Sequence, residues 1–295
     1  MVAQSLPLSY FGKEGQHEAY ISHLLRRRCS QNLSRRHNHY HVMPHYRQKR
    51  FSTFYSGLVA FKKWLLENNC KDVCMESTGK YWVPVWNVLE DSVHVVIANP
   101  KWVSAVKGNK DDKKDSKWIG DLFRMGLVPS SYIPSKDIRI LREFTRYRSK
   151  LVSMRSSEKN RFQNAFTVCN LTLDAVVSDM FGKSATDIEN YLLDTDIVDP
   201  AQCVSLLRGS LKKNSSDVVE AVSGFNMTPE QKERVRIVQG HFADIDRRIA
   251  QLDGVIGNLV AVYEGQISLL CTIPGVDRRI AITILSEIGT DMTKF

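Results

Sequence analysis

The stretch Asp72-Val73-Cys74-Met75-Glu76 decides the fold, and a run of small residues, Ser77-Thr78-Gly79, follows it. Its apolar residues predict a short β-strand with Val73 and Met75 on one face and Cys74 and Glu76 on the other. The residues after Glu76 predict a turn. A carboxylate therefore stands at the end of a strand that is otherwise suited to burial.

The flanking sequence extends this strand into an α/β pattern. A second strand is predicted from Val93 to Ala98, where a continuous apolar run indicates burial on both faces. Before the first strand, Leu58, Phe61, Leu65 and Leu66 form the apolar stripe of an amphipathic helix that ends near residues 68–69. Helices that alternate with strands predict an α/β sheet.

Residues 1–50 lack this regularity. They hold three adjacent arginines and a histidine-rich run, with no aspartate and no alternation that predicts a strand. His37, His39 and His41 alternate as metal ligands can, but no carboxylate or cysteine lies near them. We therefore expect an irregular basic arm, either disordered or mistranslated, over residues 1–50.

The net charge of +9 is concentrated in two parts of the chain. Residues 1–50 hold nine Lys and Arg against two acids, and residues 101–165 hold sixteen against seven. Such basic blocks attract a polyanion such as a nucleic acid. A solvated, lysine-rich surface is the simpler interpretation of the same residues.

Cysteine spacing and hydropathy exclude several classes of protein. The six cysteines lack the paired spacing of a zinc ribbon or a disulfide scaffold, and Cys70 and Cys74 have no second pair to complete a metal site. No apolar run approaches the roughly 20 residues that span a bilayer. We expect a soluble, cytoplasmic protein with reduced thiols.

Asp112 and Asp115 open a predicted helix in the second basic block. Counting back from Leu122 in steps of three and four residues reaches Trp118 and Ile119, then Asp115, then Asp112, so both acids share the face that packs on the sheet. Together with Glu76 they could supply the oxygen ligands that Mg²⁺ prefers. Alternatively, they are first-turn acids that stabilise the helix dipole.

Three runs in this order resemble transposases of insertion-sequence family 110. They are Met75–Trp82 with Val83-Pro84-Val85-Trp86, then Lys110–Asp115 with Trp118 and Asp121-Leu122, then Leu141–Arg148. The resemblance spans roughly residues 51–295. It implies an N-terminal domain similar to RuvC-type resolvases, of RNase H fold, with four acids in the order Asp, Glu, Asp, Asp. Glu76 matches the second acid, Asp112 the third and Asp115 the fourth, and these three are the expected catalytic and Mg²⁺-binding residues.

The first acid of the resemblance has no counterpart in this chain. In the family it lies on the first strand about 50 residues before the glutamate, which here falls near Arg27. We therefore expect an RNase H/RuvC-like domain that lacks its first strand and a metal site that lacks a ligand. Our hypothesis is that residues 1–50 come from a wrong reading frame or a damaged gene.

A basic helix is predicted from about Ser135 to Phe166. One side carries Leu141, Phe144, Leu151, Val152, Phe162 and Ala165 towards a core. Tyr147 is expected to pack rather than to stack on a base. Another face carries cations that suit a phosphate backbone, and with two lysines beside the acid pair they are the expected nucleic-acid-binding residues: Lys110, Lys114, Arg139, Arg142, Arg146 and Lys150.

A second long helix is predicted to begin at Pro229, because Thr228 and Gln231 form a capping box around it. Residues 229–263 then carry a coiled-coil seam at alternating intervals of three and four: Val235, Val238, Phe242, Ile245, Ile249, Leu252, Ile256, Leu259 and Tyr263. The seam could pack on an earlier helix of the same chain or on another subunit. We favour self-association, because members of the family form oligomers.

Residues 269–289 resemble the start of the family's C-terminal transposase domain and a helix-hairpin-helix, whose turn amides bind phosphate. Asp277 stands where a second glycine is usual, which weakens that interpretation. In the family a nucleophilic serine lies further on. The chain stops at Phe295 before that segment, and Ser286 lies too early to match it, so we expect no catalytic serine in this chain.

These predictions divide the chain into a basic arm (1–50), a RuvC-like domain with the basic helix (51–165), a helical region with a coiled coil (166–265) and a truncated C-terminal domain (266–295). The resemblance implies DNA transposition by RNA-guided strand exchange, with DNA, a guide RNA of the same element and further copies of the chain as partners. We expect a fragment that is inactive alone and associates with the nucleoid of a prokaryote. A non-catalytic nucleic-acid-binding remnant and a resolvase-like nuclease are the alternatives.

Overall fold

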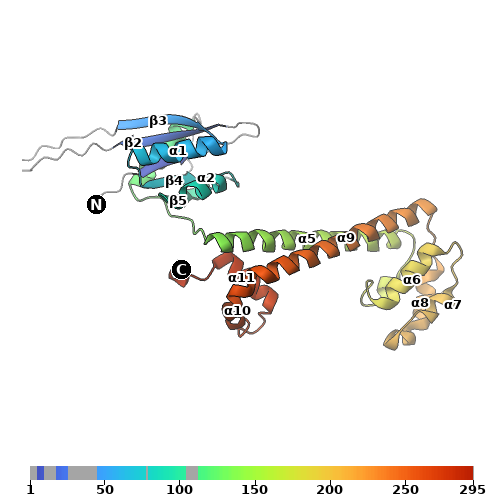
Figure 1. The fold of residues 1–295 in the computed structure, drawn as a ribbon. Helices are drawn as coiled ribbons and strands as arrows, with labels where there is room; N and C mark the ends of the chain where they lie inside the picture. Colours follow the sequence, from blue (N-terminus) through green and yellow to red (C-terminus); the bar gives the residue numbers. More distant parts are fainter. Residues whose placement is uncertain (1–4, 10–17, 26–44, 78, 104–111, 295) are drawn as a thin grey trace, which may run out of the picture. The chain divides into compact units, whose positions relative to one another are not determined.

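The computed structural model describes residues 5–9, 18–25, 45–77, 79–103 and 112–294, with side chains for 49–77, 79–102 and 118–293. The chain forms two compact units, Met1–Ile133 and Pro134–Phe295 (Figure 1). The first unit is a mixed α/β domain and the second is helical. No helix of the described residues is both long and apolar enough to cross a membrane.

The first unit is built on a five-stranded sheet in the order β3-β2-β1-β4-β5. Its strands are β1 (Ser5–Ser9), β2 (Glu18–Leu25), β3 (His45–Ser52), β4 (Asp72–Glu76) and β5 (His94–Ala98). Strands β1 to β3 pair antiparallel, whereas β1, β4 and β5 run parallel. This mixed order is consistent with an RNase H-like fold.

The prediction that residues 1–50 form no strand, and that the domain lacks its first strand, is therefore wrong. Strands β1 and β2, and most of β3, lie in this region, and β1 pairs with β4 from Ser5 opposite Asp72 to Leu8 opposite Met75. Strand β3 is an edge strand, and its Lys49 and Arg50 are exposed while Phe51 is buried. Backbone pairing holds such a strand without the apolar alternation on which the sequence prediction relied.

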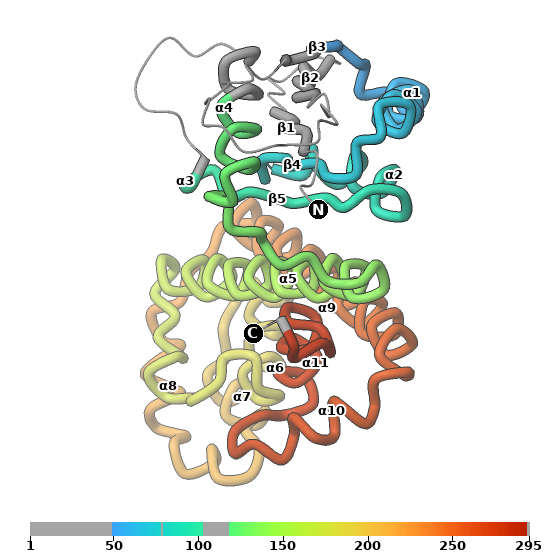
Figure 2. Tube along the Cα trace, turned by 90° about the vertical axis from the view of Figure 1, so that its left-hand side faces the viewer, coloured from blue at the N-terminus to red at the C-terminus, as the bar shows by residue number. Residues whose placement is uncertain are grey.

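Helices cover both faces of the sheet. Helices α1 (Tyr55–Glu67) and α2 (Trp82–Leu89) pack on the face that carries Val73 and Met75. Helix α4 (Asp112–Arg124) follows the short α3 (Pro100–Val103) and lies against the other face, over β1, β2 and β4 (Figure 2). Cys74, Val96 and Ala98 lie on this second face, and Ile119 of α4 packs against them and buries them. The predicted alternation along β4 and the burial of both faces of β5 are confirmed.

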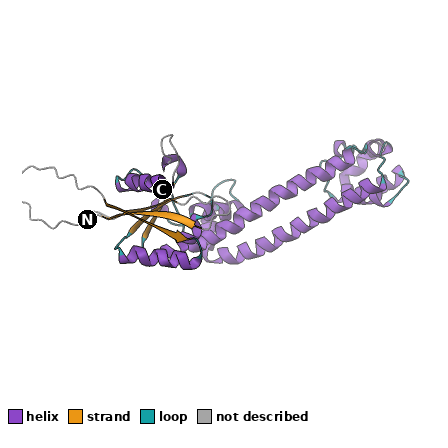
Figure 3. Cartoon of the chain, turned by 90° about the horizontal axis from the view of Figure 1, so that it is seen from above, coloured by secondary structure: helices purple, strands orange, loops and turns teal. Residues whose placement is uncertain are grey.

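The second unit is organised by two long helices, α5 (Lys136–Thr167) and α9 (Pro229–Val260), which pack along each other (Figure 3). They run antiparallel, since Ile138 near the start of α5 meets Val260 at the end of α9. Arg148 pairs with Asp253, and Arg155 with Asp246, across the helix pair. The capping box predicted at the start of α9 is present.

The coiled-coil seam of α9 faces α5 of the same chain, which is the arrangement that the sequence analysis did not favour. All nine seam residues are buried or half-buried. Leu151 of α5, for example, packs between Ile245 and Ile249. Self-association through this seam would have to displace α5, so an oligomer of this chain would need another surface.

A small helical subdomain closes one end of the helix pair. It contains α6 (Lys183–Asp194), α7 (Pro200–Ser205) and α8 (Ser215–Ser223), with the 3₁₀ turns η1 (Leu173–Ala175) and η2 (Gly209–Asn214). Its core joins Phe162 of α5 and Val235 of α9 to the apolar faces of these helices. Lys232 and Arg236 of α9 donate to the carbonyls of Thr195 and Leu193, which fixes the end of α6 on the long helix.

A helical hairpin lies at the other end of the pair. The turn η3 (Ala261–Tyr263) leads into α10 (Glu264–Leu270), α11 (Arg278–Ile288) and the turn η4 (Met292–Lys294). The predicted two-helix arrangement is confirmed. The Asp277 carboxylate accepts a hydrogen bond from the Ile280 amide at 2.7 Å, so this residue caps α11 with its own negative charge.

Candidate metal centre and nucleic-acid interface

Glu76 ends β4 on the sheet face that α4 covers. Cys74, two residues earlier, packs against Ile119 of α4, and residues two apart in a strand point to the same side. Glu76 is half-buried, and its backbone pairs with Ala98 at the end of β5. Two parallel strands therefore place this carboxylate at their carboxyl ends, beneath the helix that carries the other two acids.

Asp112 is the first residue of α4 and Asp115 lies in its first turn. Their backbone is described but their side chains are outside the described residues. Asp115 is four residues before the buried Ile119, and Asp112 is seven before it, so helical spacing places both on the stripe that faces the sheet. Trp118 is 40% exposed, so it lies at the edge of this stripe rather than at its centre.

Strand β1 contributes no carboxylate to this face. Its five residues are Ser5, Leu6, Pro7, Leu8 and Ser9, and Pro7 stands opposite Cys74. One further step along the parallel register brings Ser9 to the position beside Glu76. The acids that the sequence analysis nominates on these elements are Glu76, Asp112 and Asp115, and the residue that comes next in the register of β1, beside Glu76, is Ser9.

The two cysteines of this region do not extend the donor set. Burial raises the pKa of the Cys70 thiol and of the Cys74 thiol to about 12. A cysteine binds metal as the thiolate, so both remain protonated and non-ligating at neutral pH. Among the residues whose side chains are described, no group of three His, Cys, Asp or Glu could hold a metal ion, and the acid pair of α4 lies outside that set.

The predicted cationic residues fall into two groups. Lys110 lies outside the described residues, and only the backbone of Lys114 in α4 is described. The other four lie on α5, where Lys150 is exposed and Arg139 donates to the Pro134 carbonyl at 3.1 Å. Their contact with a nucleic acid stays a prediction.

Arg142 and Arg146 hold the end of α11, which the sequence analysis did not foresee. The Arg142 guanidinium donates to the carbonyls of Ser286 and Glu287 at 3.0 and 2.5 Å. Arg146 forms a two-pronged ion pair with the Glu287 carboxylate at 2.8 and 2.7 Å, and its hydrogen bonds hold the pKa of Glu287 below its ordinary value. More than 140 residues separate these partners, so no local pattern could have indicated them.

Ser286 has a structural role in this arrangement. It is fully buried, accepts a hydrogen bond from Thr145 of α5 at 3.0 Å, and donates to the Thr283 carbonyl at 2.8 Å. A hydroxyl without exposure and with both hydrogen bonds made inside the fold has no access to a substrate.

Comparison with known protein families identifies the part of the chain that contains these three acids. The model of a transposase family, the DEDD domain of IS110 elements, matches residues 33–170. These residues are an IS110-family DEDD transposase domain. The match runs from the region before β3 through β4 and α4 to the end of α5, so it contains Glu76, Asp112 and Asp115.

The DEDD transposase domain begins earlier than the sequence analysis expected. Residues 33–50 fall inside the match, so the prediction that the first 50 residues lie outside the family is wrong for them. A search of curated proteins found no match. The domain implies a role in DNA transposition and therefore binding to DNA. Domains of this family generally use a divalent metal ion.

Proposed function

We propose that this chain binds DNA as part of a transposition reaction and that its acidic centre binds Mg²⁺ too weakly to support strand exchange by the chain alone. The observation that supports weak Mg²⁺ binding is the register of β1 on β4, which, continued by one residue, gives Glu76 a serine as its neighbour. A hard divalent cation needs several oxygen ligands, and the loss of one of four carboxylates weakens its binding.

The residues that would hold Mg²⁺ are Glu76 from β4 and the pair Asp112 and Asp115 from α4. Magnesium bound there would neutralise the charge that develops on a reacting phosphate. The chain would orient that phosphate through cations, with Lys110 and Lys114 beside the acid pair as the candidates. Contacts of this kind position a nucleic acid without selecting its sequence.

A resolvase-like nuclease is the less favoured activity. It would use the same carboxylates to cut branched DNA with Mg²⁺, and so it needs the ligand that β1 does not supply. Binding of nucleic acid without catalysis needs only the cationic surface.

The proposal is tested by recombination between a donor and a target DNA in the presence of Mg²⁺, with the parent chain and Asp112→Ala in parallel. We expect no recombinant junctions from either protein, because the acidic centre is incomplete in both. Junctions that form with the parent chain and disappear with Asp112→Ala would show a working acidic centre and would overturn the proposal.

A further inference from the structure

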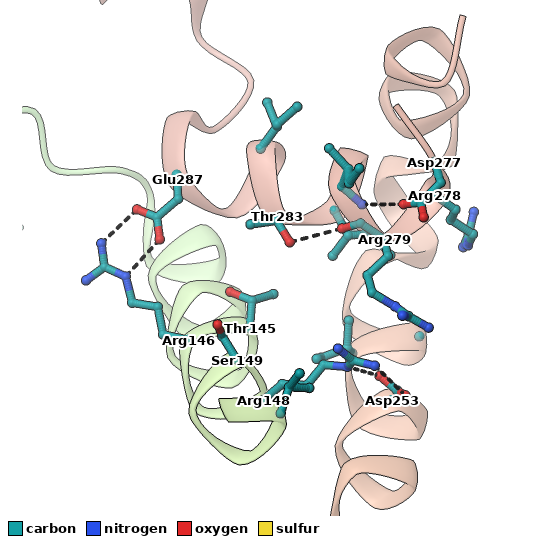
Figure 4. Close-up of a pocket in the computed structure, with 16 residues that line it drawn as sticks. Thr145, Arg146, Arg148, Ser149, Asp253, Asp277, Arg278, Arg279, Thr283 and Glu287 are labelled. Atoms are coloured by element: carbon teal, nitrogen blue, oxygen red, sulfur yellow. Dashed lines mark hydrogen bonds and ion pairs between the residues drawn. The ribbon is translucent and has the colours of Figure 1, made fainter. Parts of the chain in front are cut away.

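A groove of about 800 Å³ lies within the second unit, between α5, α9 and α11 (Figure 4). Its apolar lining includes Val152, Ile256 and Ile284. Four arginines also line it: Arg146, Arg148, Arg278 and Arg279. Three carboxylates line the groove as well, those of Asp253, Asp277 and Glu287, so the arginines exceed the acids by one charge.

Acidic side chains of the same unit hold three of these arginines. Glu287 pairs with Arg146 from the end of α11, and Asp253 pairs with Arg148 from α9. Arg278 pairs with Glu264. Arg279 makes no side-chain hydrogen bond or ion pair with the residues that the structure describes, and it acts on Asp253 by charge alone.

We propose that this groove binds the phosphodiester backbone of a nucleic acid and that Glu287 occupies the Arg146 guanidinium until a phosphate displaces it. This inference rests on the proposed function, because it names the surface through which the chain would hold DNA or RNA. Arg146 and Glu287 lie at one end of the groove, whereas Arg279 lies on the side of Asp253 at the other end (Figure 4).

The chemistry of the guanidinium group favours such an exchange. Its planar fork donates two parallel hydrogen bonds to a carboxylate or to a phosphate with similar geometry. The Arg146 side chain is 63% exposed and that of Glu287 is 38% exposed, so water screens their ion pair and its net stabilisation is small. A polyanion that also reaches Arg279 gains a cation that has no carboxylate bonded to it.

Displacement of Glu287 need not release the hairpin. Arg142 lies 3.4 Å from the Glu287 carboxylate, but it also donates to the backbone carbonyls of α11, and Thr145 binds the buried Ser286 hydroxyl. These backbone and hydroxyl contacts do not need the Glu287 side chain. Ala281 and Leu285 of α11 also pack against Ile138 and Leu141 of α5. The exchange would therefore change the charge exposed in the groove while α11 stays in its place.

A double-mutant cycle on Arg146 and Glu287 tests the inference in the full chain. Binding of fluorescent duplex DNA, single-stranded DNA and single-stranded RNA of one length is measured for the parent, Glu287→Gln, Arg146→Gln and the double variant. We expect Glu287→Gln to tighten binding about two- to fivefold, which corresponds to the usual strength of an exposed ion pair. We expect Arg146→Gln to weaken binding and to abolish the gain from Glu287→Gln.

Asp244→Asn is the matched control, because it removes one negative charge and releases Arg247 and Arg248 on α9 outside the groove. A gain from Glu287→Gln that equals that of the control, or that persists without Arg146, would overturn the inference. The polymer with the largest coupling between the two positions identifies the ligand as DNA or RNA. A parent chain that binds none of the three polymers would instead refute the proposed function, whereas binding with no coupling would refute the groove alone.

Discussion

The parent chain is expected to lose stability as the pH rises from about 5 to about 8, and replacement of Glu189 by glutamine is expected to abolish this pH dependence. Glu189 lies on the inner face of α6 with 1% of its surface exposed, and its Oε1 has no hydrogen-bond partner among the described residues. Burial, with a smaller contribution from Asp179, raises its pKa from 4.5 to about 8. The folded chain therefore keeps this carboxyl protonated at neutral pH.

The direction of the pH effect follows from the two pKa values. In the unfolded chain Glu189 loses its proton near pH 4.5, whereas in the folded chain it keeps the proton until about pH 8. Between these values the folded state binds more protons, so its stability falls as the pH rises, by about 1.4 kcal/mol per pH unit. The loss across the window is on the order of 4 kcal/mol. Glutamine is neutral throughout and carries no such dependence.

Urea denaturation at pH 5, 6.5 and 8 measures this difference. We expect the free energy of unfolding of Glu189→Gln, relative to that of the parent chain, to increase at each step to higher pH. Glu220→Gln on α8 is the control, because Glu220 is exposed and its neutralisation should leave the parent's pH profile in place. Parallel profiles for the parent and Glu189→Gln would show that Glu189 is not a buried acid.

A carboxylate introduced at Ser9 is expected to increase the affinity of the chain for Mg²⁺. Ser9 is the last residue of β1, and it follows Leu8, which pairs with Met75, so the next step of the register places it beside Glu76. Aspartate there would add a fourth carboxylate to those of Glu76, Asp112 and Asp115. Affinity for a hard cation rises with the number of charged oxygen ligands, so we expect an increase on the order of tenfold or more.

Isothermal titration with Mg²⁺ compares the parent chain, Ser9→Asp and Ser9→Asn. The asparagine variant has nearly the same shape as aspartate without its charge, and it should bind no more tightly than the parent. A further Asp112→Ala change in the Ser9→Asp chain should remove the gain. Equal affinities for the aspartate and asparagine variants would show that β1 does not face the acid pair of α4.

The parts of this fold that the sequence predicted are those with a strong local signal. The alternation in β4, the apolar run of β5 and the cap at Thr228 each depend on neighbouring residues, and each is confirmed. Strands β1 to β3 have weaker patterns and are joined through backbone pairing with residues far along the chain. The formation of these three strands therefore depends on their pairing partners more than on their own composition.

In the candidate sites, too, the sequence predicted features that depend on nearby residues but not contacts between residues far apart in the chain. Spacing alone placed Asp112 and Asp115 on one helix face, and the resemblance gave Glu76 its role. The contact of Arg146 with Glu287 joins two helices that no periodicity relates. Glu189 could have been found, because it is four residues after the buried Ala185 and one after Ile188, on the apolar face of α6.

The choice of α5 as the partner of α9 was open in the sequence for a physical reason. A heptad seam specifies that an apolar partner helix exists, but not whether that helix belongs to the same chain. The partner is identified by Leu151 and by the ion pairs of Arg148 and Arg155, which require the antiparallel alignment of these two helices.

The measurement that tests the central claim most directly is DNA binding by the parent chain and Asp115→Ala, each in Mg²⁺ and in a chelator, over a range of salt. We expect all four affinities to agree and to fall steeply with salt, because cations rather than a metal centre hold the DNA. Lys150→Ala should reduce the salt dependence by about one counterion, whereas Lys212→Ala, an exposed lysine of η2, should not. Binding that requires Mg²⁺ and is lost in Asp115→Ala would contradict the account.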